Sequence, residues 1–331
     1  MDLTTPLCDQ LGIRFPVVQA PIGSATTCEL VAAAANAGAL GMLSATWLEA
    51  PVVAERIRHV QGLTKGAFGV NVSLDFGIDA QLDACLELGV GIVSTFWGDP
   101  QKVHERIRDA GALHLHTVRS PAEARIAVDA GVDVIVAQGW EAGGHVWGEV
   151  ATMPLVPAVV DEVAPVPVIA AGGIADGRGL AAALMLGAQA VWLGTRFVAA
   201  AEAGTHGDYR SRIVSAGVDD TVYTTCFDGG WPDAPHRVLS NDTHRAWVAA
   251  GRPAAPHRPG EGRAIASDET GRAFLLYDDI MPLRGVRGEI TEMALYSGQS
   301  AGLVREVLPA ARIITDIVAE AQRSLRAWGP A

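Results

Sequence analysis

The sequence predicts an α/β protein built as a (β/α)8 barrel (TIM barrel), with a smaller insertion, or lid, after the eighth strand. Two observations predict it. Eight apolar runs of strand length alternate with Ala-rich helical stretches up to about residue 205, and a Gly closes most of those helical stretches. An open doubly wound sheet usually has fewer strands and a G-x-G-x-x-G turn after the first, which this chain lacks. Eight strands with seven intervening helices favour a closed barrel.

The eight runs are almost continuously apolar, as is typical of parallel strands that helices cover on their outer face. We predict strands at Phe15–Pro21, Gly41–Ala45, Phe68–Ser73, Ile92–Trp97, His114–Val118, Asp133–Gly139, Val166–Gly173 and Ala190–Arg196.

Glycines mark where the predicted helices end. Pairs such as Ala37-Gly38, Leu88-Gly89, Ala110-Gly111 and Ala130-Gly131 each stand just before a predicted strand. Gly adopts the left-handed conformation at a helix C-terminus without a steric penalty, so the pattern indicates a helix end followed by a strand.

The alternation is lost between about residues 203 and 289, where Pro, Gly, His and Arg are frequent. We predict a lid over the barrel mouth, with helices near Tyr209–Ala216 and Asn241–Ala250; the alternative is a solvated excursion. An amphipathic stretch, Pro309–Trp328, is expected to be the last barrel helix. The predicted division is residues 1–204 plus 290–331 for the barrel and 205–289 for the lid.

The charge and composition disfavour nucleic-acid-binding and membrane-spanning proteins. A formal net charge of −12 disfavours a nucleic-acid partner, and no apolar run reaches the length of a membrane span. The four cysteines are far apart, which predicts reduced thiols rather than a disulfide framework or a zinc site. We therefore expect a cytoplasmic enzyme with a small-molecule substrate, and leave open a homo-oligomer.

Two Gly-rich strand ends predict a phosphate site. Ala171-Gly172-Gly173 follows the seventh strand and Gly194-Thr195 follows the eighth. Glycines let backbone N–H groups approach a phosphate, and phosphate sites recur at this corner of the fold. The alternative is tight turns that serve only the barrel geometry.

The loop after the sixth strand carries the candidate base. Gln138 to Gly148 contains four glycines and a single imidazole, His145, which titrates near neutral pH when unperturbed. His145 is the predicted general base; the alternative is a structural hydrogen-bonding residue. Glu141 is either a second acid–base group or a loop cap. Trp140 and Trp147 either wall a pocket or shield the loop.

Other polar groups at strand ends are mainly amides. Asn71 ends the third strand and Gln138 ends the sixth, and both can bind a ligand ring or chain. His114-x-His116 places two imidazoles on one strand face, either lining the barrel or packing near its mouth. A site with one base, several amides and phosphate loops predicts a cofactor that carries the redox chemistry.

At these residues the chain resembles the nitronate monooxygenase family of FMN-binding TIM-barrel enzymes. The matching segments are Gln19-Ala20-Pro21-Ile22, Gly69–Val72, Gln138–His145, Ala170–Ile174, Gly194–Phe197 and Tyr296–Gly302. The family's loop commonly continues His-Arg-Gly, whereas here Val146 and Trp147 follow His145, so a basic residue is absent.

The resemblance implies a role for each matching residue. Pro21 and Ile22 would contact the flavin ring, Asn71 and Gln138 would hydrogen-bond FMN, and Gly143 and Gly144 would pack beside it. Gly172, Gly173, Gly194 and Thr195 would hold its phosphate with help from Gln299. Ala20 and Ala171 complete the cofactor-binding set, and His145 matches the catalytic histidine. The implied reaction is oxidation of an alkyl nitronate by O₂ to a carbonyl compound and nitrite.

Three alternatives stay open. An FMN enzyme that takes hydride from NAD(P)H, similar to the enoyl-ACP reductases or the NADH:quinone reductases, would share the barrel and its loops. A non-redox barrel acting on a sugar phosphate would need a Lys or paired carboxylates at strand ends, but Lys65 and Lys102 fall in loop or helix. A binding protein with a degenerate site is the third.

Overall fold

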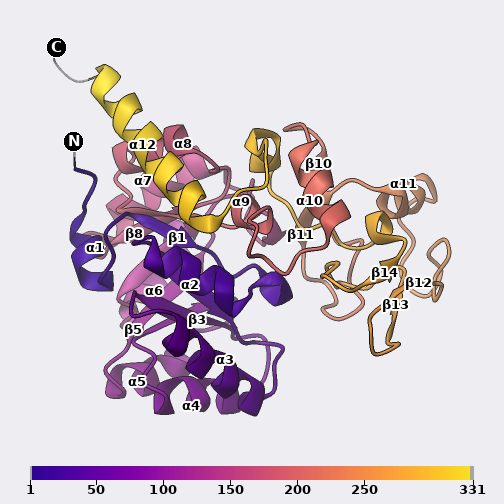
Figure 1. Ribbon diagram of the computed structural model, residues 1–331, viewed down its shortest axis with the longest axis horizontal. Helices are drawn as coiled ribbons and strands as arrows, with labels where there is room; N and C mark the ends of the chain where they lie inside the picture. Colours follow the sequence, from indigo (N-terminus) through magenta and orange to yellow (C-terminus); the bar gives the residue numbers. More distant parts are fainter. Residues whose placement is uncertain (1, 329–331) are drawn as a thin grey trace.

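The computed structural model describes residues 2–328, and a closed barrel of eight parallel strands forms its centre (Figure 1). The barrel closes where the first strand pairs with the last, with Val17 opposite Val191. This confirms the predicted TIM barrel, and each predicted strand overlaps an observed one. The barrel strands are β1 (Val17–Gln19), β2 (Leu40–Ser44), β3 (Phe68–Ser73), β4 (Ile92–Phe96), β5 (Leu113–Val118), β6 (Val134–Gln138), β8 (Val168–Ala171) and β9 (Ala190–Leu193).

Helices connect successive barrel strands and cover their outer faces (Figure 1). Six of the seven connecting helices follow their strand after a short loop. The helix after β6 is preceded by a longer loop. Pro121 opens one of them at the first position, where the side chain of Ser120 accepts a hydrogen bond from Glu123 N–H. The seven connecting helices are α2 (Cys28–Asn36), α3 (Ala50–Leu63), α4 (Asp79–Glu87), α5 (Gln101–Asp109), α6 (Pro121–Asp129), α7 (Thr152–Val163) and α8 (Gly177–Met185).

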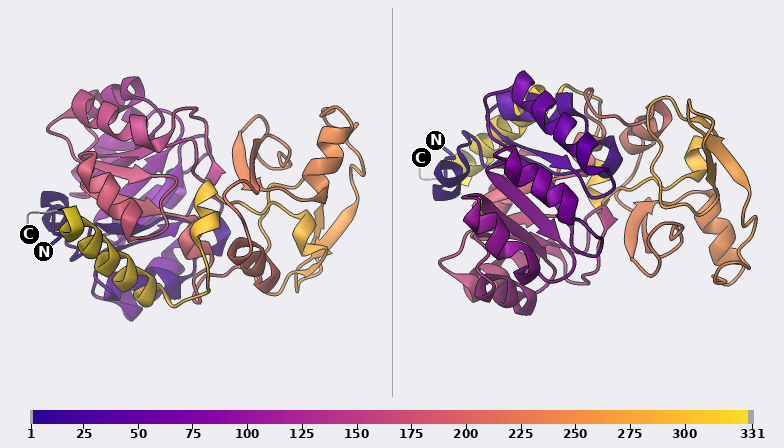
Figure 2. Two further views of the ribbon diagram at one scale, coloured as in Figure 1. Left: turned by 90° about the horizontal axis from the view of Figure 1, so that it is seen from above. Right: turned by 90° about the horizontal axis from the view of Figure 1, so that it is seen from below.

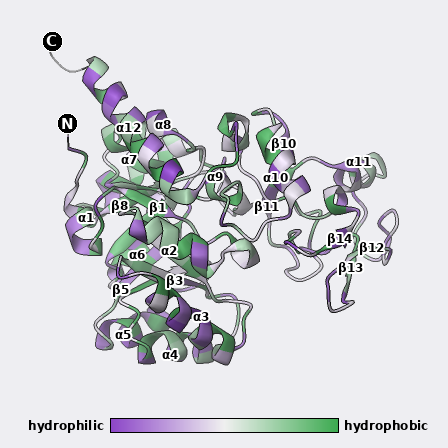
Figure 3. Cartoon of the chain, in the orientation of Figure 1, coloured by the Kyte–Doolittle hydropathy of each residue, from purple (hydrophilic) through white to green (hydrophobic). Residues whose placement is uncertain are grey.

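The predicted last barrel helix is α12 (Ala310–Trp328), which packs against α8 and α2. Its apolar residues Ile313, Ile314 and Ile317 are buried, and Figure 3 shows hydrophilic and hydrophobic colours on the same helix. A short helix, α1 (Pro6–Leu11), precedes β1. Both α1 and α12 lie on the side of the barrel away from the lid (Figure 2).

The barrel is packed inside as well as outside. Val18, Met42, Leu115 and Ile169 point inward from four strands and are fully buried. Because alternate residues of a strand face opposite sides, their neighbours pack instead under the helices. The barrel interior is therefore a solid core, and the space available to a ligand lies at its mouth.

The predicted lid, residues 205–289, has a hydrophobic core of its own, around Phe227, Val238, Phe274 and Tyr277. It lies to one side of the barrel, as Figure 2 shows from two directions. The predicted helices are confirmed as α10 (Gly207–Val214) and α11 (Asp242–Ala249), after the four-residue α9 (Thr195–Val198). The boundaries at residues 204 and 290 remain a prediction.

The lid also contains two small antiparallel sheets, which the sequence patterns did not predict. One joins β10 (Thr221–Thr224), β11 (His236–Leu239) and β7 (Gly144–His145); the other joins β13 (Ala273–Leu275), β12 (Ala264–Ser267) and β14 (Arg287–Gly288). The first sheet links the lid to the loop after β6. Within the described residues, no helix has both the length and the apolar character needed to cross a membrane.

Candidate active site at the barrel mouth

A cavity of about 720 Å³ opens at the mouth of the barrel, where the C-terminal ends of the strands face the lid. Its volume is within the range typical of cofactor and small-molecule sites. One side is formed by residues that follow β1, β3, β6, β8 and β9, and the other by lid residues between Gly229 and Val286. Barrel and lid therefore build the site together.

The cavity brings the predicted site residues together, with a single exception. Gln299 does not line it, and the neighbouring Ser300 does. The predicted residues that line it are Ala20, Pro21, Ile22, Asn71, Gln138, Gly143, Gly144, His145, Ala171, Gly172, Gly173, Gly194 and Thr195.

One end of the cavity is lined by backbone donors. Among the described residues, the N–H groups of Gly172, Gly173 and Gly194 have no hydrogen-bond partner. Gly172 and Gly173 have φ angles of 100° and 73°, a conformation that favours glycine. The Thr195 hydroxyl accepts a hydrogen bond from Gly298 N–H at 2.9 Å. Unpaired N–H groups at the end of a cavity suit an anion such as a phosphate.

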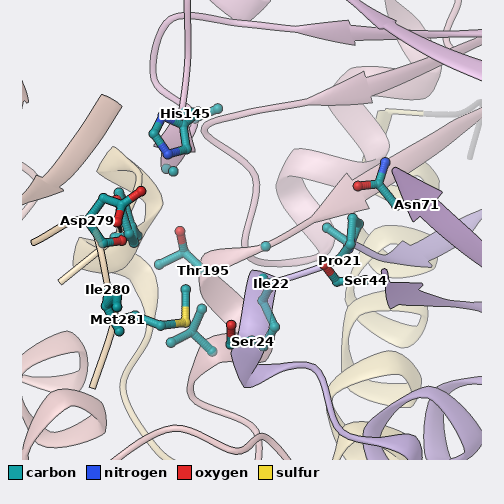
Figure 4. A pocket seen from close by; sticks show the side chains of 18 of the residues that line it. Pro21, Ile22, Ser24, Ser44, Asn71, His145, Thr195, Asp279, Ile280 and Met281 are labelled. Carbon is teal, nitrogen blue, oxygen red and sulfur yellow. Dashed lines mark hydrogen bonds between the residues drawn. The ribbon is translucent and has the colours of Figure 1, made fainter. Parts of the chain in front are cut away.

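The middle of the cavity is lined by amides and small apolar groups. The buried Gln138 Oε1 has no partner, while Gln138 Nε2 donates to the carbonyl of His145 at 3.3 Å. Asn71 is held by two hydrogen bonds from its Nδ2 to Ser94, which leaves its Oδ1 for a ligand. Figure 4 shows Asn71 and Pro21 across the cavity from His145.

His145 is placed by the small sheet that joins barrel and lid. It lies in β7, opposite His236 of β11, and the N–H of the next residue, Val146, donates to Pro235 O at 3.0 Å. Its ring packs against the ring of Trp231, with centroids 4.3 Å apart. Two strands and an aromatic neighbour therefore fix the imidazole at the cavity wall.

Burial decides the charge of His145. Burial, with a smaller effect of the nearby His236, lowers the pKa of the imidazole to about 3. The backbone groups of Ala234 and Pro235 oppose these effects only in part. At neutral pH the ring is uncharged, so it can accept a proton.

The other polar groups of this loop have structural roles. The carboxylate of Glu141 accepts hydrogen bonds from the N–H and hydroxyl of Thr152, at 2.9 and 3.0 Å, and so caps the first turn of α7. Of the two interpretations of Glu141, the loop cap is the one its contacts support. Trp140 and Trp147 do not line the cavity: Trp140 lies under the guanidinium of Arg237, and Trp147 donates to Glu123.

One prediction about histidines needs correction. His114 and His116 do not line the barrel interior; they lie on the outer face of β5, because inward-facing Leu115 separates them. Their ring nitrogens are 2.8 and 2.7 Å from the hydroxyl of Thr95, and His104 of α5 packs on His114. The spacing of the two residues showed that their side chains lie on the same face of the strand, but not whether that face is the inner or the outer one.

Two further aromatic residues border the site, and neither had a predicted role. Tyr296, the first residue of the matching segment Tyr296–Gly302, packs against His145, with ring centroids 5.5 Å apart, and its hydroxyl donates to the carbonyl of Asp279 at 2.8 Å. The Trp231 indole N–H donates to Asp75 of the barrel at 2.8 Å, which ties the lid to the mouth. No periodicity marks these positions, because they lie in irregular segments.

Gly143 allows the loop after β6 to pass beside the strand-like segment at Ser297. A Cβ at Gly143 would overlap the backbone of Gly298 and Ser297. Gly143→Ala is therefore expected to destabilise the protein by about 2 kcal/mol and to displace His145. Chemical denaturation checks this. Gly62→Ala is the control, because its Cβ would meet open space on α3 and is expected to leave stability equal or higher. Equal effects of the two substitutions would contradict the prediction.

A comparison with known families identifies the protein's relatives. A family model described as nitronate monooxygenase matches residues 4–81 and 75–320. The chain belongs to the nitronate monooxygenase family. It is an oxidoreductase of that family, and the predicted resemblance is confirmed.

Three relatives illustrate how varied this family is. The chain is 40% identical over 246 residues to the (3aS,4S,5R,7aS)-5-hydroxy-7a-methyl-1-oxo-octahydro-1H-indene-4-carboxyl-CoA dehydrogenase of Mycobacterium tuberculosis, covering 73% of this chain and 68% of that enzyme. It is 33% identical to the dehydrogenase of the same description from Rhodococcus jostii, covering 99% and 98%. Among solved structures, FabK from Thermotoga maritima is similar with a TM-score of 0.84 and 33% identity, covering 98% and 97%.

Proposed function

We propose that the protein is an FMN-dependent oxidoreductase that oxidises a carbon acid, with His145 as the base and a coenzyme A thioester as the favoured substrate. The observation that carries the proposal is the shared cavity. An uncharged, buried imidazole faces the same space as a row of unpaired backbone N–H groups. A phosphate-bearing redox cofactor and a proton acceptor can therefore act on one substrate.

The residues present fit FMN. The unpaired N–H groups of Gly172, Gly173 and Gly194 suit the phosphate, and a Cβ at Gly194 would enter open space. The orphaned Oε1 of Gln138 suits an N–H of the flavin ring, and Pro21 and Ile22 supply an apolar face. When bound, FMN would accept two electrons from the substrate.

In this proposal His145 removes the proton from the carbon next to the thioester carbonyl. The hydrogen on the neighbouring carbon would leave with its electron pair, which bound FMN would take up, and a carbon–carbon double bond would form. The chain's own contribution is an imidazole that is unprotonated at neutral pH and held in place by the pairing of β7 with β11.

Two features favour a thioester with an apolar acyl group. Trp47 and Phe96 line the cavity and offer aromatic walls. At the lid side, Arg272 and Arg284 also line it, and neither forms an ion pair with a carboxylate of the described residues. Arg284 donates to the carbonyls of Ala201 and Ala203, and Arg272 lies over the ring of Phe274. Guanidinium groups that no carboxylate neutralises suit the phosphates of coenzyme A. The two dehydrogenase relatives act on a carboxyl-CoA by their description.

Nitronate oxidation by O₂ is the second candidate, and the description of the matching family model favours it. Its substrate is a small anion. The residues that follow His145, Val146 and Trp147, provide no positive charge beside the base. The absence of this charge favours a thioester over a nitronate as the substrate.

The test is anaerobic reduction of the FMN-loaded protein by three compounds, mixed separately. Cyclohexanecarbonyl-CoA is expected to bleach the flavin absorbance. Bleaching by propyl-2-nitronate alone would replace the first candidate with the second. Bleaching by NADH alone would move the protein to the NAD(P)H-dependent reductases, and failure to take up FMN would reject all three.

A further inference from the structure

The side chain of Asp279 lines the cavity and has no part in the oxidation proposed for His145. It lines the cavity from the lid, and its carboxylate forms no hydrogen bond or ion pair with the side chain or backbone of another described residue. Figure 4 shows it on the same side of the cavity as His145. A half-buried carboxylate without a partner is costly to keep, which points to a function.

Two links place Asp279 close to His145. Tyr296 contacts the His145 ring and donates its hydroxyl to the Asp279 carbonyl at 2.8 Å. Gly230 adjoins Asp279 so closely that a Cβ there would lie 2.5 Å from the carboxylate. The residue after Gly230 is Trp231, whose ring packs on His145.

The chain conformation around Asp279 is held firmly. Tyr277 has a φ of 75°, a left-handed conformation that aromatic residues rarely adopt. Its hydroxyl donates to Pro259 O at 2.8 Å, its ring lies under the guanidinium of Arg258, and its carbonyl accepts from Gly229 N–H at 3.1 Å. A bulky residue kept in a strained conformation beside a cavity is typical of functional sites.

Three of the four influences on the Asp279 carboxyl raise its pKa. Burial raises the pKa of its carboxyl, its own N–H opposes this, and Asp278 and Asp228 raise the pKa further. Tyr296, whose hydroxyl donates to the Asp279 carbonyl, is uncharged at neutral pH, whereas the guanidinium groups of Arg272 and Arg284 line the same cavity and favour the charged form of Asp279. His145 and Asp279 therefore have pKa values shifted in opposite directions, as is typical of a base paired with an acid.

We propose that Asp279 is a catalytic acid of this site, which in its neutral form donates a hydrogen bond to the substrate oxygen where negative charge develops. His145 accepts the proton from carbon, and Asp279 keeps its proton while it stabilises the oxygen. It takes the place of the positive charge that Val146 and Trp147 do not supply. The inference rests on the proposed oxidation of a carbon acid.

The test compares Asp279→Asn with Asp279→Ala in the FMN-loaded protein. An Asn amide still donates a hydrogen bond at every pH, whereas Ala does not. In the wild type, kcat/KM for cyclohexanecarbonyl-CoA is expected to fall as pH rises through the pKa of Asp279. In the Asn variant this fall is expected to disappear. In the Ala variant kcat/KM is expected to be roughly 10²-fold lower than in the wild type at low pH.

Asp219→Asn is the matched control. Asp219 is an exposed carboxylate outside the cavity, so its replacement is expected to leave kcat/KM and its pH profile unchanged. Wild-type activity of the Ala variant would overturn the proposal, as would equal losses in the Asn and Ala variants. A readout without turnover separates this proposal from the proposed function. Infrared difference spectra across the acid titration are expected to show a protonated-carboxyl band that Asp279→Asn removes, and persistence of every band would also overturn it.

Discussion

Replacing His145 by Gln is expected to lower kcat/KM by roughly 10³-fold, because the site then lacks its proton acceptor. Gln fills a similar volume and keeps hydrogen-bonding capacity, so the packing against Trp231 and Tyr296 stays largely intact. FMN uptake is expected to be retained, since the phosphate end of the cavity is built by other residues. The measurement is steady-state kinetics of the FMN-loaded variant together with a flavin titration.

His59→Gln is the control for this substitution. His59 is an exposed residue of α3, outside the cavity, and its replacement is expected to leave kcat/KM unchanged. A His145→Gln variant with normal FMN binding and wild-type kcat/KM would show that His145 only shapes the loop. The structural interpretation of this residue, left open by the sequence, would then be the correct one.

Acid is expected to destabilise the protein by several kcal/mol, and the loss begins at a pH above the range in which carboxylates titrate. Burial, together with His116 and His104, lowers the pKa of His114 to about 3; burial lowers the pKa of His116 to about 4, although Asp99 opposes this shift. In the unfolded chain a histidine titrates near 6.5. A group whose pKa is depressed by folding contributes stability above its unfolded pKa, and this contribution is lost as the pH falls towards the folded value.

For His114 alone the expected loss between pH 7 and pH 4 is about 3 kcal/mol. The fall begins near pH 6.5 and continues to about pH 3. Urea denaturation as a function of pH measures it. His116→Asn removes one of the buried imidazoles and is expected to make the decline shallower, even if stability at pH 7 is lower. A decline as steep as that of the wild type would contradict the prediction.

The barrel was predictable because each of its elements has a local signal. A run such as Phe68–Ser73 is apolar enough to be a buried strand, and the observed β3 has these bounds. The Gly-rich ends at Gly172 and Gly194 follow strands whose C-termini meet at the mouth. Such residues converge once the fold is known, which explains why the residues predicted to bind the cofactor lie in one cavity, with Gln299 outside it.

The lid half of the site could not be predicted in the same way. Trp231, Asp279 and Tyr296 belong to irregular segments, where neither a period of two nor one of 3.6 marks an inward face. They reach His145 through tertiary contacts between residues far apart in the chain. The pairing of β7 with β11 is also non-local, and β7 has only two residues, too few to show a pattern.

The most direct test of the account is the rate of anaerobic flavin bleaching with α-deuterated and unlabelled cyclohexanecarbonyl-CoA. If His145 removes the α-proton in the step that reduces the flavin, the deuterated compound is expected to react more slowly, and His145→Gln to bleach with neither compound. Equal rates for both compounds, together with undiminished bleaching in His145→Gln, would contradict proton removal by His145 as the step that drives the oxidation.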